Sequence, residues 1–62
     1  MSKQSYFIKY RKEDPTGVLS LGTHKIRAVS EKEALARFVR WDNHRPDAAE
    51  YAIAKYWIER VG

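Results

Sequence analysis

The sequence contains no cysteine, so neither a disulfide nor a thiolate metal site can hold this chain together. Its two histidines, His24 and His44, lie far apart and without the paired spacing of a zinc site. We therefore expect no metal and no cofactor. No apolar stretch approaches the roughly 18 residues of a membrane-spanning helix, and the N-terminal residues lack the apolar core of a signal peptide.

Catalytic motifs are equally scarce. The three glycines form neither a P-loop nor a dinucleotide-binding pattern. Ser20 has no partner that would activate a nucleophile, and Ser30 is accounted for below as a helix cap. Glu31 and Glu33 fall in the first turn of an expected helix, where the helix dipole favours carboxylates. We expect a protein that is not an enzyme.

Positive charge is present in excess and is unevenly distributed. The net charge is +4 over 62 residues, which we interpret as one small basic domain, residues 1–62. Residues 1–29 carry six basic and two acidic side chains, whereas residues 30–62 carry six of each. A cationic N-terminal half would attract nucleic acid or the acidic surface of a protein.

Alternating polar and apolar residues predict a β-hairpin. Residues 5–12, SYFIKYRK, alternate with period two and are rich in aromatic side chains, as in a strand. Residues 13–17, EDPTG, have the composition of a turn. Residues 22–29 form the predicted return strand, and residues 18–21 either widen the loop or begin that strand. A hairpin alone is unstable in water, so one face must be covered.

The alternation also divides the hairpin into an apolar and a basic face. The apolar face is expected to pack on a helix, and the predicted core comprises Tyr6, Ile8, Tyr10, Ile26, Ala28, Leu35 and Phe38. The opposite face would present the basic residues Lys9, Arg11, Lys25 and Arg27, together with Phe7. Such a patch could contact phosphates or an acidic protein surface.

The segment AVSEKEALARF, residues 28–38, supplies the covering helix. Ser30 and Glu33 form a capping box, in which the serine hydroxyl accepts a hydrogen bond from the Glu33 N–H. A helix is predicted over residues 31–41. Its apolar stripe would consist of Ala34, Leu35, Phe38 and Val39, and its other face would carry Lys32, Arg37 and Arg40.

The C-terminal segment supports two interpretations. As a helix, residues 47–61 would have an apolar stripe that begins at Ile53. As a strand, the same segment suits a sheet in composition, but Ile53 and Ile58 would then lie on opposite faces unless a bulge intervenes. Trp41 and Trp57 are possible interface anchors, and we expect at least one of them to close the core.

The order of a hairpin, then AVSEKEAL, then a terminal WIERV resembles small phage-encoded proteins that inhibit bacterial RNA polymerase or CRISPR interference (anti-CRISPR proteins). The resemblance implies an antiparallel sheet with one helix, and it favours a third strand for the tail. The predicted fold is therefore α+β, with ββαα as the alternative. It also implies binding without chemistry, in the cytoplasm of a bacterial host cell.

Three functions remain open, and the first two use the same residues. The first is inhibition of a host nucleoprotein complex by a protein that is expected to be a monomer and to bind no membrane. The alternative is a module that binds DNA or RNA directly, and a third possibility is a subunit of a larger assembly. The candidate binding residues are Lys9, Arg11, Lys25, Arg27, Arg37 and Arg40, with Phe7 and Trp57 as anchors.

Overall fold

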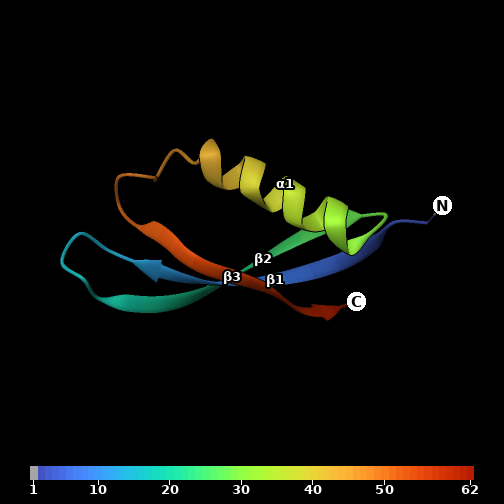
Figure 1. Ribbon diagram of the computed structural model, residues 1–62, viewed down its shortest axis with the longest axis horizontal. Helices are drawn as coiled ribbons and strands as arrows, with labels where there is room; N and C mark the ends of the chain where they lie inside the picture. The colour runs from blue at the N-terminus through green and yellow to red at the C-terminus, as the bar shows by residue number, and fades with distance from the viewer. Residues whose placement is uncertain (1) are drawn as a thin grey trace.

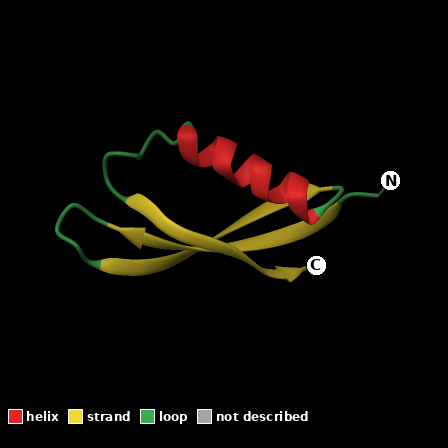
Figure 2. Cartoon of the chain, in the orientation of Figure 1, coloured by secondary structure: helices red, strands yellow, loops and turns green. Residues whose placement is uncertain are grey.

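The computed structural model describes residues 2–62 and contains a three-stranded antiparallel sheet with one helix on one face (Figures 1 and 2). The elements are β1 (Gln4–Glu13), β2 (Leu19–Ala28), α1 (Glu31–Asn43) and β3 (Ala52–Val61). The strand order is β2-β1-β3, so β1 is central and both of its neighbours have a free edge. The predicted α+β fold is confirmed.

A tight turn joins β1 to β2 and makes both strands longer than predicted. One carboxylate oxygen of Asp14 accepts hydrogen bonds from the Thr16 N–H, the Thr16 hydroxyl and the Val18 N–H, at 2.9, 2.6 and 2.9 Å. These bonds, first of all that of the hydroxyl, lower the pKa of Asp14. Gly17 takes a positive φ of 87°, which glycine adopts without strain. The turn is therefore compact, and the return strand begins at Leu19 instead of residue 22.

The C-terminal segment is a strand, and the helical alternative for residues 47–61 is wrong. β3 pairs with β1 and contains two irregularities, opposite Phe7/Ile8 and opposite Arg11/Lys12. The second lies between Ile53 and Ile58, and both side chains pack against the core. The bulge that is needed to place Ile53 and Ile58 on the same face of the strand is therefore present.

The ends of the sheet are joined by backbone hydrogen bonds between Ser5 and Gly62. The Gly62 N–H donates to the Ser5 carbonyl at 2.7 Å, and the Ser5 N–H donates to the Gly62 carbonyl at 3.2 Å. The C-terminal strand is thus held along the whole of β1.

The core lies between α1 and the sheet. Its buried members are Tyr6, Ile8, Tyr10, Ala28, Ala34 and Phe38, with Ile26, Leu35, Trp41, Tyr51, Ile53 and Ile58 packed around them. Every predicted core residue belongs to this set. Phe38 is fully buried, and its ring centroid lies 4.9 to 5.5 Å from those of Tyr10, Trp41 and Tyr56.

The predicted helix stripe was wrong at one position. Val39 is 37% exposed, and Trp41 takes its place against the sheet. Trp41 follows Phe38 by three residues and Ala34 by seven, so it lies on their side of the helix. Its ring stacks on that of His24, with centroids 4.1 Å apart and planes 18° apart. Trp41 is thus the tryptophan that helps to close the core.

α1 begins as predicted and ends two residues later, at Asn43. The Ser30 hydroxyl accepts from the Glu33 N–H at 3.2 Å, which is the first of the two contacts of the predicted capping box. The Glu33 carboxylate pairs with Arg37 Nε at 3.1 Å, one turn further along the helix. This pair is exposed and contributes little to stability.

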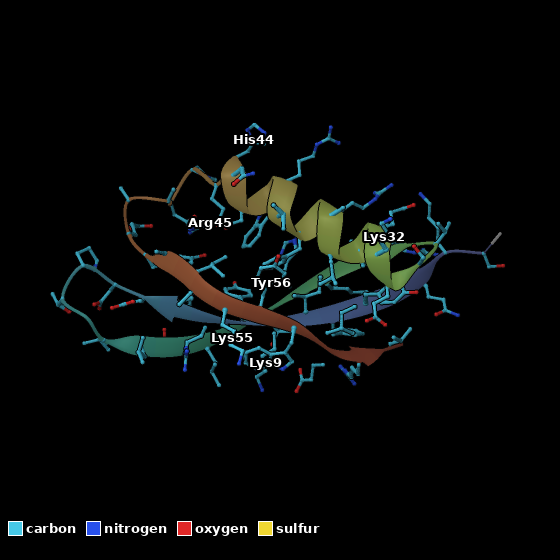
Figure 3. The ribbon with its side chains drawn as sticks, viewed as in Figure 1. Lys9, Lys32, His44, Arg45, Lys55 and Tyr56 are labelled. Carbon is cyan, nitrogen blue, oxygen red and sulfur yellow. The ribbon has the colours of Figure 1, made fainter. Side chains whose placement is uncertain are left out.

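Arg45 fastens the connection from α1 to β3. Although it is only 8% exposed, its guanidinium binds Asp42 at 2.8 Å, Asp47 at 3.3 Å and the Tyr51 carbonyl at 2.9 Å. It also lies over the Tyr51 ring, 4.2 Å from the centroid. Figure 3 shows Arg45 between the end of the helix and this connection. The two carboxylates thus neutralise the guanidinium, and the bond to Tyr51 holds the connection next to the residue at which β3 begins.

Gly22 is required by the close packing of Tyr10. A Cβ at position 22 would lie 2.6 Å from Tyr10 Cζ and 2.7 Å from its hydroxyl oxygen. Tyr10 is buried and is the direct cross-strand partner of Gly22.

We expect Gly22→Ala to lower the free energy of unfolding by about 1–3 kcal/mol, because an overpacked core must shift. Urea denaturation measures this, with Thr23→Ala as control; equal effects would contradict it.

Candidate binding surface

The sheet face opposite α1 gathers basic and aromatic side chains, and we call it the outer face. Strand pairing places residues from all three strands on it: Phe7, Lys9, Arg11, Lys25, Arg27, Lys55, Trp57 and Arg60. In Figure 3, the labelled Lys9 and Lys55 project from the sheet away from the helix. The outer face is thus open to a partner, because the helix covers only the other side.

Six of the eight predicted binding residues meet on the outer face. Phe7 is the cross-strand partner of Lys25, and Lys9 is the partner of Trp57. Arg11 and Arg27 occupy the same face of β1 and β2 by alternation. The period-two pattern of the hairpin was enough to place five of them together, whereas the position of Trp57 follows from the pairing of β3 with β1. Their role in binding remains a prediction.

Lys55 and Arg60 belong to the outer face but were not among the predicted residues. Lys55 pairs with Arg11, and Arg60 pairs with Phe7. Two bulges interrupt the alternation of β3, so its outward positions cannot be assigned from spacing alone. The alternation of Lys55 and Trp57 was the available signal, and the helical alternative obscured it.

Trp57 and Phe7 differ in how they are presented. Trp57 is 38% exposed and lies on an edge strand. Phe7 is partly buried; the Arg60 guanidinium carbon lies 4.1 Å from its ring centroid, and Lys25 Nζ lies 5.9 Å away. The outer face therefore offers one open indole and one ring bordered by two cations.

Most of the charge on this face is unpaired. Lys9 Nζ lies 3.4 Å from a Glu59 carboxylate oxygen, and both side chains are partly exposed. Such a pair is weak, because water and salt screen it. Within residues 2–62, the other five cations of the outer face form no ion pair. Basic side chains consequently outnumber acidic ones on this face, which favours the binding of anions.

Arg37 and Arg40 do not join the outer face. Both lie on α1, which packs on the opposite side of the sheet. They border a groove of about 510 Å³ beside β2, which also contains Lys25 and Arg27. The six predicted cations thus form two neighbouring surfaces and not one flat patch.

The tip of the hairpin is apolar and exposed. Val18, Leu19 and Leu21 are 55–60% exposed. Leu19 and Leu21 border a shallow hollow of about 260 Å³ together with Arg11. This apolar tip is therefore continuous with the basic outer face.

Within residues 2–62 no group of three or more potential metal-binding side chains is found, and no described helix is long and apolar enough to cross a membrane. Burial lowers the pKa of His24, whose ring lies against Trp41. His24 thus packs at the edge of the core, and the other histidine, His44, is exposed and directly follows the helix.

No family model matches the chain, and neither the curated proteins nor the solved structures include a significant match.

Proposed function

We propose that this protein binds single-stranded nucleic acid on its outer face and performs no chemistry on it. The observation that supports this most is the placement of Trp57 and Phe7 among six cations on one uncovered sheet face. Bases stack on aromatic rings while lysine and arginine bind the phosphates between them.

A single strand fits this surface better than a duplex. Stacking on Trp57 requires an unpaired base, because the faces of bases in a duplex are occupied by their neighbours. The Arg60 guanidinium over Phe7 provides a second planar platform. No part of this arrangement distinguishes one base from another, so we expect little sequence preference.

Salt dependence tests the proposal directly. The affinity for a fluorescein-labelled oligothymidylate, measured by anisotropy, should fall linearly on a plot of log K against log salt. Arg11 and Lys55 are paired neighbours without ion-pair partners among residues 2–62. The variant Arg11→Ala/Lys55→Ala should reduce the slope by about 1.4, since each phosphate contact on a single strand contributes about 0.7.

The matched control is Lys32→Ala, which removes an exposed cation from the helix. It should leave the slope of the oligothymidylate plot unchanged. If the double variant and the control have the slope of the unaltered protein, the outer face does not bind the phosphates and the proposal fails.

The apolar tip favours a second candidate function. Val18, Leu19 and Leu21 are of no evident use to a phosphate-binding face, but exposed apolar residues beside charges are typical of protein interfaces. In this candidate, the protein is a phage or mobile-element inhibitor that acts in the bacterial cytoplasm. It would block a nucleoprotein complex such as RNA polymerase or the CRISPR interference machinery.

A pull-down from bacterial lysate distinguishes the two functions. An inhibitor should retain a protein complex after nuclease treatment, and Leu19→Ser/Leu21→Ser should release it while oligonucleotide binding persists. Loss of all captured protein after nuclease treatment would contradict the inhibitor function and leave the nucleic-acid function in place.

A further inference from the structure

The groove between α1 and the free edge of β2 is a second basic surface. It has a volume of about 510 Å³, and its cations are Lys3, Lys25, Arg27, Arg37 and Arg40. Among the described residues that line it, none is acidic, and Trp41 and His24 contribute aromatic surface. A groove of this composition attracts anions.

The groove is continuous with the outer face. Lys25 and Arg27 occupy outward positions on β2, opposite Phe7 and Ser5 of β1, and they also line the groove. β2 is an edge strand, so no further strand separates the two surfaces. A ligand that crosses the outer face can pass around β2 and remain next to cations throughout.

The cations of the groove are available to a ligand. Within residues 2–62, Lys25, Arg27 and Arg40 form no ion pair. Arg37 is bound to Glu33 through Nε at 3.1 Å, yet its side chain is 51% exposed. Its remaining guanidinium N–H groups can still donate to a phosphate.

We propose that this groove binds the phosphates of the same nucleic-acid strand after it leaves the outer face around the edge of β2. This inference rests on the proposed function and extends it, because it states the path that the strand follows from the outer face to the groove. The two surfaces would have different roles. Bases stack on the aromatic side chains of the outer face, and the groove binds the phosphate backbone of the nucleotides that follow. The occupied length of strand is therefore longer than the sheet face alone requires.

Oligothymidylates of increasing length, from about 4 to about 16 nucleotides, test the inference, since single-strand sites on small domains span this range. A short strand should bind the protein and the variant Arg37→Ala/Arg40→Ala alike. A long strand should bind the unaltered protein more tightly than the short one does, and the variant should lose that gain. For the long strand, the salt slope of the variant should be smaller by about 1.4.

The control is again Lys32→Ala, on the same helix but outside the groove lining. It should retain the full gain with length. If length brings no gain, or if Arg37→Ala/Arg40→Ala keeps it, the groove does not hold the strand and the inference is overturned.

Two further outcomes distinguish a failure of this inference from a failure of the proposed function. If no oligothymidylate binds at any length, the proposed function itself has failed. If polyglutamate binds and its binding requires Arg37 and Arg40, while oligothymidylates gain nothing with length, the groove takes an acidic polypeptide and the inference is overturned in favour of a protein partner.

Discussion

Replacing Phe38 with alanine is expected to remove a large part of the stability of the protein. The side chain is fully buried and contacts aromatic rings from the helix, β1 and β3. Truncating a buried phenylalanine costs about 3–5 kcal/mol. A domain of this length has only roughly 3–9 kcal/mol of stability in total. Urea denaturation followed by circular dichroism measures this loss of stability, and the folded-state baseline of the curve should be shortened or absent.

Val39→Ala is the matched control for this prediction. It truncates the neighbouring apolar residue, which the sequence pattern assigned to the apolar stripe of the helix but which is 37% exposed. We expect it to change the free energy of unfolding by less than about 1 kcal/mol, as surface substitutions usually do. If Val39→Ala destabilised the protein as much as Phe38→Ala, the orientation of α1 described above would be wrong.

The variant Phe7→Leu/Trp57→Leu should weaken oligothymidylate binding at least about 30-fold. Stacking of one base contributes about 1–3 kcal/mol, so losing the Trp57 ring, together with the Phe7 ring that supports the Arg60 platform, costs at least about 2 kcal/mol. Leucine keeps apolar bulk on the sheet but has no flat face on which a base can stack. The cations remain, so the salt slope should stay nearly constant while the affinity falls. Anisotropy titrations at several salt concentrations measure both quantities.

Leu21→Ala serves as the control on the same face. Leu21 is exposed and pairs with Arg11, but it has no ring. Oligothymidylate should bind this variant with unchanged affinity. A circular dichroism spectrum of the leucine double variant must match that of the unaltered protein. Undiminished affinity in that folded variant would contradict the stacking role of the two aromatic residues.

The hairpin and the helix could be predicted because their signals are local. Alternation placed Tyr6, Ile8 and Tyr10 on the buried side, and the Ser30 cap set the start of the helix. The length of the hairpin could not be obtained in this way. It depends on three hydrogen bonds to one Asp14 oxygen, which allow Val18 to follow the turn immediately and Leu19 to begin the strand.

The features that escaped prediction depend on contacts between distant parts of the chain. The outward positions Lys55 and Arg60 became clear only when bulges set the register of β3 against β1. Arg45 has no signal in the sequence, since its burial results from the bend of the connection around Tyr51. The separation of Arg37 from the outer face likewise follows from the placement of α1. Local spacing gives a residue's face on its own element but not the position of that element.

The pairing of β1 with β3 has a consequence for how the protein is made. Of the three strands, β1 comes first in the sequence and its second partner β3 comes third, so one edge of β1 remains unpaired until Ala52–Val61 have been synthesised. Until then Ile8 and Tyr10, which the finished sheet buries, lack the cover of Ile58 and Tyr56. Contacts between such distant segments also form slowly. The hairpin and helix alone therefore leave one edge of β1 unpaired, and the sheet is complete only once β3 has been synthesised.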